Sequence, residues 1–145
     1  MLVIMKLWIF KNSGYLAWVI ALVAMLGSLY FSEFAGIQPC ILCWYQRIAM
    51  YPLVAVVGVG ILRKDRALWT YALPLSIIGT GVAFYHNLLQ WHVISETLAP
   101  CTLGVSCVTR TVIALDFITI PLLSLGAFVL ITAFMFAYRV YNRHG

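Results

Sequence analysis

Four long apolar segments, almost free of charge, constrain this chain more than any other feature. They cover residues 14–31, 44–62, 67–89 and 117–138. Each is close to the length, about 20 residues, that a helix needs to cross the roughly 30 Å hydrocarbon layer. A soluble domain of 145 residues could not hide a composition that is 64% hydrophobic and 9% charged. The sequence therefore predicts an all-α, four-helix bundle integral to the membrane, as one domain over residues 1–145.

The first segment could instead be a removable secretory signal. Lys6 and Lys11 precede it, but its apolar stretch is longer than the usual signal core and no A-x-A-like cleavage site follows. We therefore expect the segment to stay as a span. Pro52 and Pro74 fall inside two other spans, where membrane helices tolerate proline, so we expect kinks and not breaks.

The four cysteines lie in the first and third connections between spans, which share one side of a four-span protein. Basic residues in short loops mark the cytoplasmic side. Seven of the nine lie at the termini and in the second connection: Lys6, Lys11, Arg63, Lys64, Arg66, Arg139 and Arg143. Membrane orientation accounts for the net charge of +5 better than nucleic-acid binding does. We predict a multi-pass protein of the cell membrane, with cytoplasmic termini and all four cysteines on the extracytoplasmic face, where disulfides persist.

The stretch QPCILCWYQR holds a C-x-x-C pair, Cys40 and Cys43. Such a pair serves as half of a metal site, as a static disulfide or as a dithiol that cycles. Zinc sites usually combine two close pairs, whereas the second pair here, Cys101 and Cys107, is separated by five residues, so we predict no metal site. A permanent disulfide remains an alternative.

The neighbours of the first pair favour redox chemistry. Pro39 and the apolar run after Cys40 predict that a helix begins there, with Cys43 in its first turn, where free backbone N–H groups stabilise a thiolate. Arg47 follows four residues later on the same face. Its guanidinium can lower a thiol pKa and can donate hydrogen bonds to a carbonyl oxygen. The alternative for Arg47 is an interfacial side chain that reaches toward water.

His86 and Asn87 offer polar groups at a similar depth near the outer end of the third segment. The alternative for His86 is a simple hydrogen bond to a neighbouring helix. The second cysteine pair, in PCTLGVSC, contains Gly104, which lets the chain bend enough to join Cys101 to Cys107. A short exposed disulfide of this kind is open to attack by a thiolate.

A relay between the two pairs needs a terminal electron acceptor. The sequence has no glycine-rich dinucleotide loop, no C-x-x-C-H haem attachment and no iron–sulfur spacing. An acceptor dissolved in the membrane remains. A lipid quinone fits this description, because it is apolar, redox-active and has carbonyl oxygens for Arg47 and His86 to bind.

The stretch PCILCWYQR resembles the P-C-x-L-C-x-x-x-R signature of the DsbB family of disulfide bond formation proteins. The short second outer loop makes the chain most similar to compact, BdbC-type members. The resemblance covers essentially the whole chain. It implies an enzyme, a quinone-dependent thiol:disulfide oxidoreductase, that reoxidises a thioredoxin-like extracytoplasmic thiol oxidase of the DsbA or BdbD kind. Its cofactor would be menaquinone or ubiquinone.

The resemblance also implies roles for single residues. A reduced thiol of the partner would attack at Cys101, Cys107 would exchange with the first pair through Cys40, and Cys43 would give its thiolate to the quinone. Arg47 matches the quinone-site arginine of the family, and His86 stands where some members have a quinone-proximal histidine. Only five residues separate Cys101 from Cys107, so the order of exchange between the loops stays open.

Two rival functions remain. One is a vitamin K epoxide reductase-like enzyme, in which the active C-x-x-C lies near the outer end of a late helix, whereas here the pair opens the second. The other is a non-catalytic membrane scaffold held by two permanent disulfides.

Overall fold

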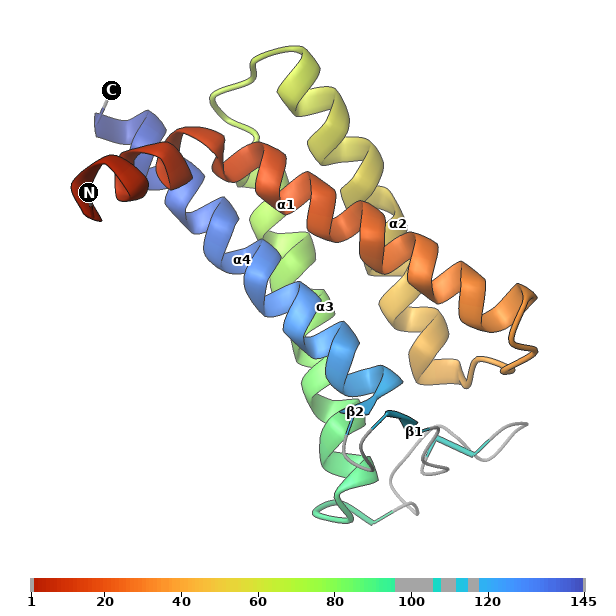
Figure 1. Cartoon of the computed structure of the whole chain (residues 1–145). Helices are drawn as coiled ribbons and strands as arrows, with labels where there is room; N and C mark the ends of the chain where they lie inside the picture. The colour runs from red at the N-terminus through yellow and green to blue at the C-terminus, as the bar shows by residue number, and fades with distance from the viewer. Residues whose placement is uncertain (1, 96–105, 108–111, 115–117, 145) are drawn as a thin grey trace.

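We describe a computed structural model of the chain over residues 2–95, 106–107, 112–114 and 118–144 (Figure 1). It contains four long helices, α1 (Leu2–Glu33), α2 (Ile41–Leu62), α3 (Trp69–Gln90) and α4 (Ile120–His144). All four are long and apolar enough to cross a membrane. The predicted membrane bundle is confirmed.

The helix ends differ from the predicted ones by a few residues at most boundaries and by more at the start of α1. The helix α1 already begins at Leu2, and α2 begins at Ile41 where the apolar segment was placed from residue 44. In these two helices the helical hydrogen bonds continue beyond the apolar stretch, so apolarity alone does not mark where they begin. Both α2 and α3 run unbroken through their prolines, Pro52 and Pro74, as expected.

Each helix packs against two others. The contacts join α1 to α2 and α4, and α3 to α2 and α4, so the four helices form a ring in chain order. Figure 1 shows both termini and the 63–68 turn at one end of the bundle, with the 34–40 connection and the strands at the other. The two cysteine-bearing connections therefore share an end, as the even number of intervening spans requires.

Small residues let the helices approach closely. Ala17 and Ala21 of α1 are fully buried in the core. On α3, a Cβ placed on Gly79 would lie 2.1 Å from the Phe128 ring of α4, so this glycine makes room for the largest fully buried side chain of the described residues. Close packing at small residues is a common way to hold membrane helices together.

A two-stranded antiparallel sheet precedes α4 and was not predicted. Strand β1 (Val112–Ala114) pairs with β2 (Ile118–Thr119), with an irregular register between Val112 and Ala114. The sequence from residue 112 to 120 is rich in β-branched residues, which favour strands. Because β2 takes residues 118 and 119, α4 begins at Ile120 and not at residue 117, with Pro121 in its first turn, a position that suits proline.

Candidate active site

The dithiol lies at the start of α2. Cys40 is the residue before the helix, with extended backbone angles, and its carbonyl accepts the N–H of Trp44 at 3.1 Å. Cys43 lies in the first turn, as predicted. Both cysteines are free thiols, and their Sγ atoms are 3.3 Å apart. The pair is therefore reduced in the structure and close enough to form a disulfide with a small movement.

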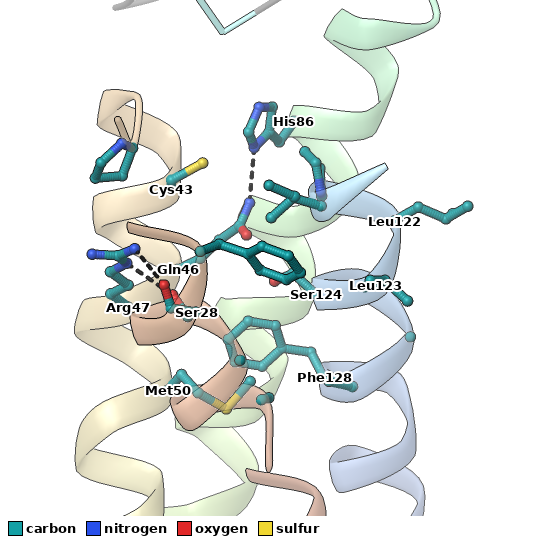
Figure 2. Close-up of a pocket in the computed structure, with 18 of the residues that line it drawn as sticks. Ser28, Cys43, Gln46, Arg47, Met50, His86, Leu122, Leu123, Ser124 and Phe128 are labelled. Carbon is teal, nitrogen blue, oxygen red and sulfur yellow. Dashed lines mark hydrogen bonds between the residues drawn. The ribbon is translucent and has the colours of Figure 1, made fainter. Parts of the chain in front are cut away.

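His86 of α3 faces the dithiol from across the bundle. The imidazole is 1% exposed, and its Nε2 lies 3.8 Å from Cys40 Sγ. Its other nitrogen, Nδ1, lies 3.0 Å from the Gln46 Nε2, the contact dashed in Figure 2. An amide nitrogen can only donate, so Nδ1 accepts and Nε2 carries the hydrogen. Gln46 thereby orients an N–H toward the Cys40 sulfur.

The Cys40 thiol lies just outside the α2 span and is easily ionised. The hydrogen bond with Cys43 is the main cause, and His86 adds to it; together they outweigh burial and lower the pKa of Cys40 to about 4. Once Cys40 has lost its proton, the Cys43 S–H donates to it. The sequence placed the ready thiolate on Cys43, whereas the described geometry favours Cys40 as the sulfur that holds the charge.

Cys107 of the second cysteine pair lies beside the first pair. It is disulfide-bonded and 2% exposed, and it belongs to the same small buried cluster as Cys40, Leu42 and Leu89. The carbonyl oxygen of Cys107 lies 3.2 Å from His86 Nε2. The same nitrogen of His86, Nε2, is thus close to both Cys40 Sγ and the Cys107 backbone. Cys101 lies outside the described residues.

Arg47 lies one turn deeper than Cys43 and is bound to α1. Its Nε donates to Ser28 Oγ and one terminal nitrogen donates to the Ser28 carbonyl, both at 2.9 Å (Figure 2). The guanidinium carbon also lies 5.4 Å from the centre of the Trp44 ring, within range of a cation–π contact. Arg47 therefore helps to join α2 to α1, a role that sequence reasoning did not assign.

A cavity of about 740 Å³ connects these groups. Cys40, Cys43, Gln46, Arg47 and His86 line it, and mainly apolar residues of α1 and α4 form the rest of the wall. The volume falls within the range of about 300–1,000 Å³ that is usual for small-molecule sites, which are also largely apolar with a few placed polar groups. The structure thus brings four of the predicted site residues, Cys40, Cys43, Arg47 and His86, onto one cavity, with Cys107 also at its wall.

Known proteins resemble the chain over most of its length. The family described as "Disulfide bond formation protein DsbB" matches residues 11–138. The chain is 48% identical to "Disulfide bond formation protein C" of Bacillus subtilis over 121 residues, which cover 83% of this chain and 88% of that protein. It is 45% identical to "Probable disulfide formation protein C 2" of Bacillus cereus, over 86% of this chain and 88% of that protein.

The likeness extends to "Probable disulfide formation protein" of Metapseudomonas resinovorans, which is 38% identical over 86% of this chain and 87% of that protein. The chain belongs to the DsbB family of disulfide bond formation proteins. No solved structure matches it. Family membership agrees with the four spans, and the chain is a multi-pass membrane protein that takes part in disulfide bond formation.

Gln46 and Ser28 are among the polar residues of this DsbB-family site that were not predicted. Gln46 is 6% exposed, and its spacing of three residues from Cys43 places both on one side of α2, a signal that the sequence did carry. Ser28 has no such signal, because its partner Arg47 lies on another helix. Asn87, which the sequence offered as a further site residue, instead joins α3 to α4 by donating to the carbonyls of Ala83 and Pro121, at 2.8 and 3.0 Å.

Proposed function

We propose that this protein reoxidises a thioredoxin-like extracytoplasmic thiol oxidase and passes the electrons to a membrane quinone. The observation that carries the proposal is the convergence at His86, where Nε2 is 3.8 Å from Cys40 Sγ and 3.2 Å from the Cys107 carbonyl, beside a largely apolar cavity. The first cysteine pair, Cys107 of the second pair and a space for an apolar ligand meet at one place. That arrangement suits a relay of electrons from the partner to a membrane quinone.

The thiol steps balance as follows. A partner thiolate attacks the second-loop disulfide at Cys101, and the partner's second thiol then closes its own disulfide, which leaves Cys101 and Cys107 reduced. The Cys107 thiolate attacks the oxidised first pair at Cys40, and Cys43 leaves as a thiolate. The Cys101 thiolate attacks Cys107 and releases Cys40. The first pair now carries the two electrons.

His86 assists the thiol exchange at the Cys40 sulfur. With Nδ1 held by Gln46, its Nε2–H points to the sulfur and stabilises negative charge there. Re-forming the bond between Cys40 and Cys43 releases two electrons and two protons. A quinone, when bound, accepts both electrons and both protons.

The cavity fits a quinone by three features. Its volume and apolar wall suit a substituted ring with a lipid tail, Cys43 lies at the wall, and Arg47 is one turn deeper. A guanidinium has five N–H donors, and the two bonds to Ser28 leave it further donors for a carbonyl oxygen. A strongly oxidising partner disulfide has a reduction potential of about −120 mV, so its regeneration needs an electron acceptor of higher potential. We propose menaquinone or ubiquinone as that acceptor.

The proposal places the cysteine end of the bundle outside the cytoplasm. The 34–40 connection, the start of α2 and the two strands lie at the end opposite the termini (Figure 1). Lys64, Arg66 and Arg139 lie at the end with the termini, which is the cytoplasmic one by the distribution of positive charge. Thiol exchange with an extracytoplasmic partner requires this orientation.

The test uses the purified full-length protein in lipid nanodiscs, with a reduced thioredoxin-like oxidase and a short-chain quinone. We expect partner oxidation that depends on quinone, followed as loss of quinone absorbance. Cys43→Ser should lower turnover by at least about a thousandfold, since the first pair can no longer close a disulfide. Turnover that survives this change would contradict the proposed relay.

A trapping experiment separates the relay from the scaffold. A partner whose second cysteine is replaced by serine cannot close its own disulfide, so its attack on the second-loop disulfide should leave it bonded to Cys101 on a non-reducing gel. The matched Cys101→Ser chain should not accumulate that species. A scaffold with permanent disulfides predicts no mixed disulfide with the unchanged chain or with Cys101→Ser.

A further inference from the structure

We propose that the reduced site is also a binding site for a thiophilic divalent cation such as Zn²⁺ or Cd²⁺, held by Cys40, Cys43 and His86. The ligand atoms of these three side chains all lie within 4.8 Å of one another. The sequence predicted no metal site, because the second cysteine pair, Cys101 and Cys107, lacks the close spacing of a zinc site. The third ligand comes from a helix 46 residues away, and only the fold brings it to the dithiol.

The distances fit a tetrahedral cation. Zinc binds thiolate sulfur at about 2.3 Å and imidazole nitrogen at about 2.0–2.1 Å, so its ligands stand about 3.6–3.8 Å apart. The two Sγ atoms are 3.3 Å apart, and Cys40 Sγ is 3.8 Å from His86 Nε2. The third pair, Cys43 Sγ and the imidazole nitrogen of His86, lies within 4.8 Å, so side-chain shifts of up to about 1 Å complete the geometry. Zinc sites of three protein ligands leave the fourth position to water or another small ligand.

The orienting contact of the histidine also fits. Metal-binding histidines usually have their second nitrogen held by a neighbouring polar group. Gln46 lies 3.0 Å from His86 Nδ1 and can present either its amide nitrogen or, turned over, its oxygen. With a cation on Nε2, Nδ1 carries the hydrogen and the oxygen accepts it.

Charge favours the cation at this depth. Two thiolates and a divalent cation sum to zero, and a neutral complex suits the edge of the hydrocarbon layer better than a charged one. The site is at the cavity wall, so a cation could reach it while the cavity holds no other ligand. Two metal–sulfur bonds and one metal–nitrogen bond form, the thiol protons pass to water, and no electron moves. The cation therefore holds the pair reduced and blocks its oxidation.

The experiment measures binding without quinone or partner, so its outcome is independent of the proposed relay. The background chain carries Cys101→Ser and Cys107→Ser, which leaves Cys40 and Cys43 as its two cysteines. The reduced, desalted protein is titrated with Cd²⁺, and the ultraviolet thiolate-to-cadmium band reports binding. We expect one Cd²⁺ per chain, displaced by Zn²⁺, with both cysteines protected from alkylation.

Two histidine variants decide the third ligand. His86→Asn should weaken Cd²⁺ binding by at least about tenfold. His92→Asn is the matched control: it removes an exposed histidine six residues away, where Asn suits the positive φ of 56°, and it should bind Cd²⁺ as the background chain does. Helix content by circular dichroism checks each fold.

Equal affinity in the background and His86→Asn chains would overturn the proposal, because the dithiol alone would then hold the cation. A stoichiometry of one Cd²⁺ per two chains would also overturn it. Should His86→Asn not fold, Gln46→Leu keeps the test sharp. It leaves all three ligands but frees the imidazole, and it should weaken binding by about ten- to a hundredfold.

Discussion

Two groups of polar side chains lie between the helices, and they are built differently. The first, which we call the seam hydroxyls, comprises Ser76 and Thr80 of α3 and Thr132 of α4. Each donates within its own helix or to another seam hydroxyl, with Thr132 Oγ1 3.0 Å from Ser76 Oγ and 2.8 Å from the Phe128 carbonyl. The second is the site group, Cys40, Cys43, Gln46 and His86.

In the site group, the bonds of His86 go to residues outside its own helix, and all four side chains line the cavity. The seam hydroxyls do not line it. The difference shows that a membrane bundle can place polar groups in two ways. Those bonded to nearby backbone carbonyls serve helix packing, whereas those that need a partner on another helix line the cavity.

The largest effect on the seam should come from Gly79→Ala. Its new Cβ would overlap the Phe128 ring, which forces α3 and α4 apart and should lower the free energy of unfolding by about 1–3 kcal/mol. Reversible denaturation in mixed micelles measures this. Gly81→Ala is the matched control, since its Cβ would meet nothing within 4 Å, and it should not be destabilised. Equal stability of the two variants would mean that Phe128 moves aside freely.

Arg47 belongs to neither group: it is bound to Ser28 of α1 and also lines the cavity. If it binds quinone, Arg47→Ala should raise the quinone concentration for half-maximal rate by about tenfold, as loss of a charged hydrogen bond costs about 1.5 kcal/mol or more. Arg47→Lys keeps the charge without the planar set of donors, so its half-maximal quinone concentration should lie between those of the unchanged chain and Arg47→Ala. The measurement is turnover against quinone concentration.

Ser28→Ala separates anchoring from ligand binding. It removes the hydroxyl acceptor of Arg47 and leaves the guanidinium in place. We expect a near-normal quinone dependence for this chain. A dependence as poor as that of Arg47→Ala would mean that Arg47 acts through its anchor to α1, and an unchanged dependence in Arg47→Ala would leave it as a structural residue alone.

The sequence carried the local part of the site. A proline before the pair and an apolar run after it place Cys43 in the first turn of α2, and a spacing of four residues puts Arg47 on the same face. These are properties of one helix. The four spans were also predictable, because long apolar segments leave few alternatives to membrane helices.

The contacts between helices were not predictable from spacing. That His86 faces Cys40, and that Asn87 beside it faces Pro121 of α4, depends on the rotation of α3 about its axis. Packing at positions such as Gly79 fixes that rotation, and a single sequence does not state which glycine meets which ring. The short strands β1 and β2 were not predicted, because two or three residues are too few to show the alternating pattern of a strand.

Gln46→Leu tests whether the site group depends on its distant partner. Cys40 is a thiolate above its lowered pKa of about 4, so its alkylation should stay level near neutral pH and fall as the pH drops through that value. Without Gln46, the imidazole is free to turn, and loss of one hydrogen bond of about 1 kcal/mol should raise the midpoint by about 0.7 pH unit. Peptide-resolved mass spectrometry follows the alkylation of Cys40.

Thr80→Val is the comparison chain for that measurement. It removes a seam hydroxyl of α3, and because the seam does not touch the dithiol, the Cys40 midpoint should not move. A midpoint that is unchanged in Gln46→Leu as well would show that Cys43 alone sets the ionisation of Cys40.

The smallest effect should come from Thr132→Val, which keeps the shape of the side chain and removes its hydroxyl. Ser76 Oγ still donates to the Leu73 carbonyl, and Thr80 still donates to the Ser76 carbonyl, so no seam donor is orphaned. Hydrogen bonds between membrane helices average about 0.6 kcal/mol, and we expect a loss of that size in the free energy of unfolding, with normal turnover. When each hydroxyl is bonded to the backbone of its own helix, removing one leaves the others bonded. A loss of several kcal/mol in the free energy of unfolding would therefore mean that the seam hydroxyls depend on one another, as the residues of the site group do.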